Sequence, residues 1–354
     1  MDFTISSCNR RVKSLSPHHN VAIVPRMEAT VPLSAAWRTD PGLVRSHNED
    51  FVIVYEPETS DDYSLHGILY VVADGVGGAD AGEVASQYAS ERTLQHYLAS
   101  DDSDGPGARL IEAMQAANTD LRRLAAERDD SRRMATTMVA VAIRDARAYI
   151  GNVGDSRGYL WREGALTQVT RDQSLVARLV EEGALTAEEA LRYPYKNVIL
   201  YSLGSEKRPP IDLFEVELES GDLLLLCSDG LTRHLADAEI AAIVGRELPD
   251  EAVEVLVQLA RERGGEDNIT VAVIQHGPRV ATEETVAVPD VDEELLTQTI
   301  ARPRPEPSPV VGMMPVTVVT EAHPRLWPLL LVLTTVMIIL IFLLWIFIQQ
   351  ATAI

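Results

Sequence analysis

Three aspartates of this chain stand where an apolar run begins or ends, close to glycine. Asp74 ends the run YVVA and precedes GVGG, Asp229 follows LLLLCS, and Asp267 stands between a glycine pair and the run ITVAVI. Carboxylates at strand ends meet at one rim of a sheet, where like charges resist being close and desolvated. Divalent cations relieve that repulsion. The three stretches together therefore predict a cation site, although an aspartate and glycine after one strand often form only a turn.

The ligand types indicate which cation this site would take. Carboxylate and main-chain oxygens suit Mg²⁺ or Mn²⁺, whereas Zn²⁺ favours histidine and cysteine. The histidines are scattered, and we interpret His47 and His234 as solvated or packing residues. Cys8 and Cys227 lie far apart without a CxxC spacing, which favours a reducing compartment. Cys227 falls inside an apolar run and is predicted to belong to the core.

The elements that must position these aspartates are strands in groups and helices in pairs. The pattern favours an α+β fold with antiparallel sheets over strictly alternating strands and helices. Apolar or alternating runs predict strands at residues 51–55, 67–73, 137–143, 147–153, 158–161, 213–218, 222–227 and 269–274. Helical spacing of apolar residues predicts helices at 82–99, 108–127, 237–244 and 250–263.

Charge excludes one class of function. The 354 residues contain 31 Lys and Arg against 53 Asp and Glu, a formal net charge of -22. Such a chain repels a phosphate backbone, so we do not expect it to bind nucleic acid. Solubility is the simplest reading of the acidity.

Composition divides the chain into segments around one folded domain at residues 34–277. Residues 1–33 lack a continuous apolar region and are predicted to form a flexible extension rather than a targeting peptide. Residues 278–325 are rich in Pro, Thr and Glu and are predicted to form a linker.

The segment 326–348 is a stretch of 23 residues without a charge, enough for one transmembrane helix at about 20 residues per span. Trp327 and Trp345 stand near its two ends, where indole rings favour the membrane interface. Arg325 precedes the span and no Lys or Arg occurs in the tail, residues 349–354. We expect a single-pass C-terminal anchor in the cell membrane with the catalytic domain in the cytoplasm.

Five blocks of the domain together resemble the bacterial metal-dependent protein phosphatases, the PPM or type 2C serine/threonine phosphatases. They occur in the order and spacing of that family: LVRSHNEDF (43–51), VVADGVGGADAGEVAS (71–86), TTMVAVAIRDARAYIGNVGDSRGYL (136–160), LLLCSDGLTRHL (224–235) and GGEDNITVAVI (264–274). The resemblance implies a four-layer αββα sandwich, two antiparallel sheets flanked by helix pairs. It also implies two Mn²⁺ or Mg²⁺ ions, with a possible third.

Residue by residue, the resemblance implies the following metal ligands. Asp74 resembles the carboxylate that bridges two metals, and Gly75 the residue whose main-chain oxygen reaches one of them. Asp229 and Asp267 resemble the ligands that complete the shell of the second metal. Two cations held by these acids would activate a water molecule to attack a phosphomonoester in line, without a covalent phosphoenzyme.

Five further positions match the family's motifs. Glu49 resembles the acid that holds a metal-bound water, with Asp50 in support beside it. Arg45 resembles the arginine that grips the substrate phosphate, because a guanidinium matches phosphate oxygens bidentately; a surface ion pair is the alternative. Asp155 resembles the ligand of a third metal, and a turn residue is its alternative. Asn268 is expected to orient the site rather than to bind metal.

The chain departs from the family at two places. Val76 stands where some members carry a histidine that could act as general acid, so that role stays unassigned. Tyr201, in the variable flap at residues 172–205, stands where many relatives carry arginine, which puts substrate choice in doubt. The implied partners are Ser/Thr-phosphorylated proteins and a membrane Ser/Thr kinase. The alternative function is an inactive, membrane-bound scaffold that binds phosphoproteins.

Overall fold

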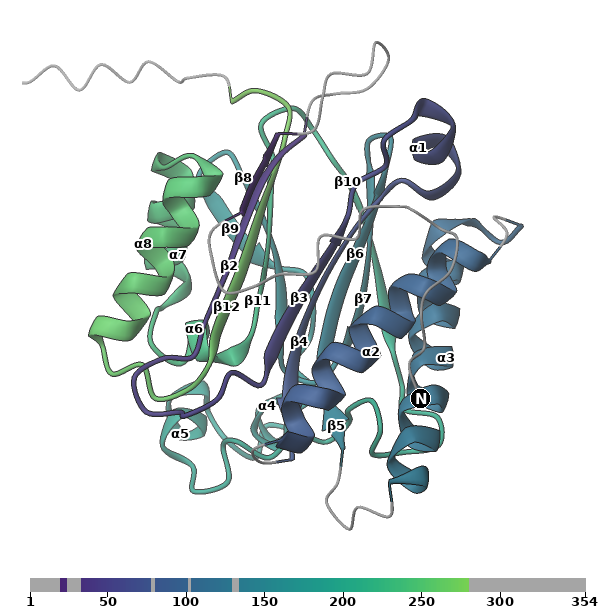
Figure 1. Cartoon of the computed structure of the whole chain (residues 1–354). Helices are drawn as coiled ribbons and strands as arrows, with labels where there is room; N and C mark the ends of the chain where they lie inside the picture. The colour runs from purple at the N-terminus through teal and green to yellow at the C-terminus, as the bar shows by residue number, and fades with distance from the viewer. Residues whose placement is uncertain (1–19, 24–32, 78–79, 101–102, 129–133, 280–354) are drawn as a thin grey trace, which may run out of the picture. The chain divides into compact units, whose positions relative to one another are not determined.

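A computed structural model describes residues 20–23, 33–77, 80–100, 103–128 and 134–279. Two antiparallel sheets pack face to face, and a pair of helices covers the outer side of each (Figure 1). This arrangement confirms the expected antiparallel sheets with flanking helices. The anchor predicted at 326–348 and the predicted linker, apart from Pro278 and Arg279, lie outside the described residues. None of the helices within the described ranges is long and apolar enough to cross a membrane.

Two of the three aspartates, Asp229 and Asp267, lie next to strands of the first sheet. Its strands follow the spatial order β1 (Asn20–Ile23), β2 (Leu33–Asp40), β12 (Ile269–His276), β11 (Leu223–Cys227), β8 (Arg157–Arg162) and β9 (Ala165–Gln168). All of its pairings are antiparallel. The pairing of β1 with β2 is a correction, because the sequence interpretation had placed residues 20–23 in a flexible extension.

The second sheet carries the third aspartate. Its strands follow the order β10 (Asp212–Glu217), β7 (Arg147–Val153), β6 (Met138–Arg144), β4 (Ile68–Val76) and β3 (Asp50–Tyr55). The two-residue strand β5 (Ala135–Thr136) pairs with the far end of β4. Every pairing in this sheet is also antiparallel.

Both faces of the central strands are buried, which explains why these strands are continuous apolar runs rather than alternating ones. In β4, Tyr70 and Val72 face the core between the sheets, whereas Val71 and Ala73 face the helices. Successive side chains of a strand point to opposite faces, so a strand between two cores must be apolar at every position. Cys227 is fully buried under the helices of the first sheet, as predicted for a core residue.

Four long helices form the outer layers. They are α2 (Asp80–Ala99) and α3 (Gly105–Glu127) on the second sheet, and α7 (Asp237–Arg246) and α8 (Pro249–Glu262) on the first. All four correspond to predicted helices. The structure adds four short helices whose length gave too few turns for a helical pattern. These are α1 (Ser60–His66), α4 (Leu175–Glu181), α5 (Ala187–Arg192) and α6 (Asp229–Thr232).

Candidate metal centre

The strand pair β3–β4 places two acids directly opposite each other. Asp50 begins β3, and its partner in the antiparallel register is Asp74. Asp74 does not end its strand as predicted, because β4 continues to Val76 and pairs there with β5. Side chains of directly opposed residues in such a ladder lie roughly 5 Å apart at Cβ. The fold therefore holds two carboxylates together that differ by 24 positions in sequence.

Asp229 and Asp267 lie at the same end of the first sheet. Asp229 is the first residue of α6, two residues after β11 ends, and Asp267 lies two residues before β12 begins. β11 and β12 are antiparallel neighbours with Cys227 opposite Val271, which brings the two acids to one edge. Both side chains are mostly covered, each with 14% of its surface exposed.

A hydrogen bond from Ser228 links the first sheet to Asp50 of the second sheet. Ser228, between β11 and α6, donates from Oγ to Oδ2 of Asp50 at 2.7 Å. The same Oγ accepts from the main-chain N of Thr270 in β12 at 3.0 Å. Ser228 is fully buried. The serine thus ties the end of β3 to the ends of β11 and β12, a role that its place in CSDG did not suggest.

Asn268 fixes the loop that carries Glu49. Its Oδ1 accepts from the main-chain N of Glu49 at 2.8 Å, and its Nδ2 donates to the main-chain oxygens of Pro41 and His47 at 3.1 and 2.9 Å. The side chain is buried with every polar atom partnered. These contacts agree with the expectation that Asn268 orients the site.

The start of α2 approaches the acids so closely that two glycines are required. A Cβ added to Gly82 would lie 2.8 Å from Cδ of Glu49, and one added to Gly75 would lie 2.3 Å from the main-chain oxygen of Gly82. Gly75 N also donates to the main-chain oxygen of Glu49 at 3.0 Å. Glu49, Gly75 and Asp74 are therefore held in one compact group.

Asp155 lies in the turn between β7 and β8 and reaches the same site. Thr137 is the connection: its N donates to the main-chain oxygen of Asp74 at 2.9 Å, and its Oγ1 lies 2.8 Å from Oγ of Ser156. Thr136 and Thr137 were not predicted to matter, because threonine before an apolar run is ordinary in a strand. Asp155 itself is 9% exposed.

The pKa values of the acids are raised, because their carboxylates are buried close to one another. Burial raises the pKa of Asp74 well above its usual range, although part of the side chain remains accessible, and the neighbouring Asp50 and Asp229 raise it further. Burial raises the pKa of Asp50 and of Asp155 to about 7, and Asp229 adds to both. Burial also raises the pKa of Glu49, against the opposing effect of Arg45. The side chains of the site thus favour protonation unless a cation offsets their charge.

Three buried carboxylate oxygens of this group accept no hydrogen bond. They belong to three different acids and are Oδ1 of Asp50, Oδ1 of Asp155 and Oδ1 of Asp229. A buried acceptor without a partner is costly, and oxygen donors of this kind are the ligands of Mg²⁺ and Mn²⁺. The residues present therefore fit divalent cations.

Two arginines already contact the remaining oxygens. Nη2 of Arg45 lies 2.9 Å from Oδ1 and 3.0 Å from Oδ2 of Asp267. Arg233, which no motif had singled out, pairs with Asp229 and Asp267. Within the ranges that the structure describes, no three His, Cys, Asp or Glu side chains form a group that could hold a metal ion. The carboxylates of Asp229 and Asp267 are instead paired with guanidinium groups.

Within the part of the chain that the structure describes, the other residues discussed from the sequence make no hydrogen bond or ion pair with the carboxylate oxygens of the site, although His47 lies near enough to lower the pKa of Glu49. His47 is exposed, and His234 accepts from the main-chain N of Glu266 at 3.4 Å. Burial raises the pKa of the Cys227 thiol to about 12, so this cysteine is not a reactive nucleophile. Tyr201 packs against the core between the second sheet and its helices. Val76 is 36% exposed at the end of β4.

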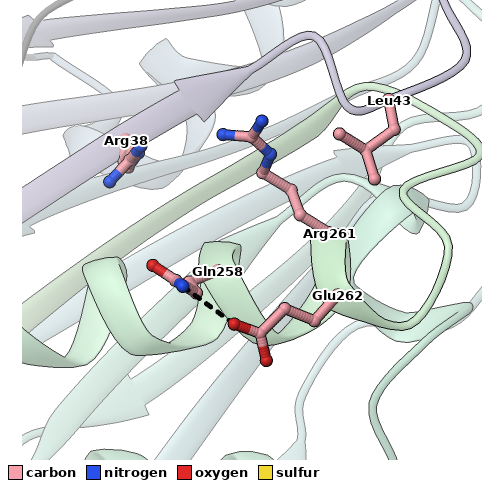
Figure 2. Close-up of a pocket in the computed structure, with 5 residues that line it drawn as sticks. All are labelled: Arg38, Leu43, Gln258, Arg261 and Glu262. Atoms are coloured by element: carbon pink, nitrogen blue, oxygen red, sulfur yellow. Dashed lines mark hydrogen bonds between the residues drawn. The ribbon is translucent and has the colours of Figure 1, made fainter.

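A separate pocket lies on the outer side of the first sheet, between β2 and α8. Its lining residues are Arg38, Leu43, Gln258, Arg261 and Glu262 (Figure 2). The predicted site residues do not line it. Gln258 donates to Glu262 at 2.8 Å, and Arg261 donates to Asp40 at 3.2 Å. The polar groups of this pocket thus have partners within the protein.

Comparison with known proteins decides the family. The sequence profile of Protein phosphatase 2C matches residues 57–267. The chain belongs to the protein phosphatase 2C family. The serine/threonine phosphatase stp of Listeria innocua is 36% identical over 250 residues, which are 69% of this chain and 96% of that protein. The predicted enzyme class, a protein phosphatase, is confirmed by this membership.

Solved structures of the 2C family agree with this fold. The crystal structure of the Mycobacterium tuberculosis serine/threonine phosphatase PstP matches with a TM-score of 0.62 and 36% identity, over 70% of this chain and 99% of that one. A structure of the PstP catalytic domain in complex with two manganese ions matches with a TM-score of 0.59 and 36% identity, over 70% and 99% of the two chains. Manganese is therefore the cofactor of a close structural relative, in line with the predicted Mn²⁺ or Mg²⁺.

Proposed function

We propose that this protein phosphatase 2C removes phosphate from phosphoserine and phosphothreonine in proteins at a centre of two Mn²⁺ or Mg²⁺ ions. The observation that carries the proposal is the group of acids drawn from both sheets, with three buried carboxylate oxygens that lack a partner. When bound, the two cations lower the pKa of a water molecule and offset the negative charge of the phosphoryl group.

The family resemblance implies the roles of the acids, and their places in the fold support these roles. Asp74 lies among the acids of the two sheets and would hold both ions, with Gly75 offering its main-chain oxygen. Asp229 and Asp267 share one edge of the first sheet and are assigned to the second ion. Asp155, with its unpartnered Oδ1, is assigned to a possible third ion.

The remaining groups bind substrate and water. Arg45 is 47% exposed and already contacts a carboxylate, so its guanidinium can reach a phosphate that approaches Asp267. Glu49, buried against Gly82, is placed to accept a hydrogen bond from a water in the site. Val76 has no proton to donate, so the position that is histidine in some relatives does not act as the general acid here.

The test is hydrolysis of a phosphothreonine peptide by the full-length chain in detergent, with Mn²⁺ and with chelator. We expect turnover with Mn²⁺ only, reduced at least about 100-fold in Asp74→Asn, which removes the bridging charge and keeps the size. Asp61→Asn, an exposed acid of α1, is the matched control and should keep wild-type turnover. Equal activity of Asp74→Asn and wild type would refute the assignment.

The same assay separates the enzyme from a phosphoprotein-binding scaffold. A scaffold would bind the phosphopeptide without releasing phosphate at any Mn²⁺ concentration. The complete set of acids favours the enzyme, because a binding module would not need three buried carboxylate oxygens without partners.

We further propose that the phosphatase acts at the cell membrane. The support is the uncharged stretch 326–348, with tryptophan near both ends and Arg325 before it. An anchor of this kind would hold the catalytic domain on the cytoplasmic face, within reach of phosphoproteins and of a Ser/Thr kinase in the same membrane. The substrates would then be the proteins that this kinase phosphorylates.

A further inference from the structure

Arg233 joins two carboxylates that come from different elements. It follows α6 as the C-cap residue, and its guanidinium turns back over the helix. Nε and Nη2 both donate to Oδ2 of Asp229, with Nε at 3.0 Å. Nη1 lies 3.3 Å from Oδ2 of Asp267. One side chain therefore contacts both of the acids that are assigned to the second metal ion and offsets part of their negative charge.

These contacts use the lone pairs that a metal ion would need. Oδ2 of Asp229 receives two donors from Arg233, and both oxygens of Asp267 contact a guanidinium, from Arg45 or Arg233. Oδ1 of Asp50, Asp155 and Asp229 accept nothing. The guanidinium groups of Arg45 and Arg233 thus contact Asp229 and Asp267, whereas these three oxygens have no hydrogen-bond partner.

The position of Arg233 allows it to give way. Its side chain is 28% exposed, and it reaches the acids from the surface through a flexible stem. Arg157 has a similar exposure, 26%, but it lies away from the acids of the second ion and is held by Asp172 through a bidentate pair and by the hydroxyl of Tyr159. Arg157 is part of the framework, whereas Arg233 can move toward solvent when a stronger cation takes its place.

We propose that Arg233 is a positioning residue that acts as an internal counter-cation and competes with the second divalent ion for Asp229 and Asp267. It holds these two carboxylates in place while the second ion is absent and weakens the binding of that ion. Arg233 thereby sets the Mn²⁺ concentration at which the centre becomes complete. This inference rests on the proposed two-metal centre.

Isothermal titration of Mn²⁺ into the metal-stripped full-length chain tests the competition directly. Arg233→Gln should lower the Kd of the weaker site roughly tenfold, since it removes charge-assisted hydrogen bonds that the ion must otherwise displace. The Kd of Arg233→Lys should lie between the values of wild type and Arg233→Gln, because an ammonium group cannot contact both acids as a planar guanidinium does. Arg147→Gln removes an equally positive side chain from an exposed pair with Glu215 and should leave the Kd unchanged.

Thermal unfolding gives a second measurement that is independent of activity. Without metal, Arg233→Gln should melt below wild type, because Asp229 and Asp267 lose their counter-cation. At saturating Mn²⁺ the two proteins should melt together. A Kd of Arg233→Gln that is equal to or higher than the wild-type Kd would overturn the proposed competition. If wild type binds two Mn²⁺ ions and turns over substrate normally, and Arg233→Gln leaves the Kd unchanged, only this inference is refuted. If wild type binds no Mn²⁺, the proposed two-metal centre is refuted as well.

Discussion

At the scale of one residue, Asp50 shows how burial among other acids disfavours an ionised carboxylate. Its Oδ2 accepts from Ser228, its Oδ1 accepts nothing, and burial raises its pKa to about 7 from 3.8. A carboxyl whose pKa is raised on folding binds protons more tightly in the folded state. Its favourable effect on stability is complete below about pH 4 and is lost as the pH rises through about 7.

Asp50→Asn should therefore flatten the pH dependence of stability in the metal-free chain. Between pH 5 and pH 8 in chelator, we expect the unfolding free energy of wild type to fall more than that of the variant. A pKa moved from 3.8 to about 7 corresponds to on the order of 4 kcal/mol as an upper bound. Urea unfolding measures the two slopes, and Asp61→Asn is the control. If the unfolding free energies of Asp50→Asn and wild type fall by the same amount between pH 5 and pH 8, the raised pKa of Asp50 is contradicted.

Arg45 is the residue at which substrate binding can be separated from chemistry. It is the more exposed of the two arginines on Asp267, and it lies in the loop between β2 and β3. We expect Arg45→Ala to raise KM for a phosphopeptide by roughly tenfold with a smaller change in kcat, because a bidentate phosphate contact is lost. Steady-state kinetics at saturating Mn²⁺ decides this. A loss confined to kcat would place Arg45 in the chemical step instead.

At the scale of elements, the junction of β11, α6 and β12 decides where Asp229 points. α6 begins two residues after β11 ends, and the main chain at Gly230 passes against the start of β12. A Cβ added to Gly230 would lie 1.9 Å from the main-chain oxygen of Asn268. The obstacle is backbone on both sides, so a side chain at this position forces α6 and β12 apart. Asp229, Asn268 and Asp267 would move with them.

Gly230→Ala should accordingly damage both stability and metal binding. We expect a loss of about 1–3 kcal/mol of unfolding free energy, as for other overpacked sites, together with weaker Mn²⁺ binding. Chemical unfolding and Mn²⁺ titration measure the two effects. The control is Ala242→Ser, which adds one heavy atom at an exposed position of the neighbouring α7. It should keep the wild-type Mn²⁺ affinity and stay within about 0.5 kcal/mol of the wild-type stability. If Gly230→Ala keeps the wild-type stability and Mn²⁺ affinity, α6 and β12 can move apart without cost and the prediction is wrong.

At the scale of the whole molecule, the acids come from two sheets that would otherwise be joined mainly by their apolar faces. The core between the sheets contains Tyr70 of β4 and Leu226 of β11, both fully buried, while Ser228 and Asp50 connect the sheets at the metal end. A cation held by acids of both sheets binds the folded state only. Its removal should therefore lower the melting temperature of the entire domain in one transition.

The anchor proposal is also tested on the whole chain. Full-length protein expressed in bacteria should sediment with membranes and resist extraction by alkaline carbonate, and a chain that ends at residue 325 should be released into the soluble fraction. The reason is the loss of the uncharged segment, 326–348. Equal partition of both chains into the soluble fraction would contradict the anchor. Protease treatment of intact spheroplasts would report on which side the domain lies.

Residue types and order were enough to predict much of the fold. The runs at 67–73 and 222–227 became β4 and β11, and the four long helices formed within a few residues of their predicted bounds. Apolar periodicity determines these elements because each must bury its faces. The strand β2 was not predicted, and neither were short elements such as β1 and α6. β1 and α6 are too short to show a period of their own, and each forms because a neighbouring strand or turn holds it.

By itself, the sequence determined the layered α+β fold and the acids that gather at strand ends. What only the tertiary structure decided is how those acids meet. Asp50 faces Asp74 through strand register, Ser228 ties the two sheets together, and Arg233 lies across Asp229 and Asp267. The physical reason is that strand and helix signals depend on neighbours in sequence. Charge pairing instead depends on distances between residues that the folded chain alone brings into contact.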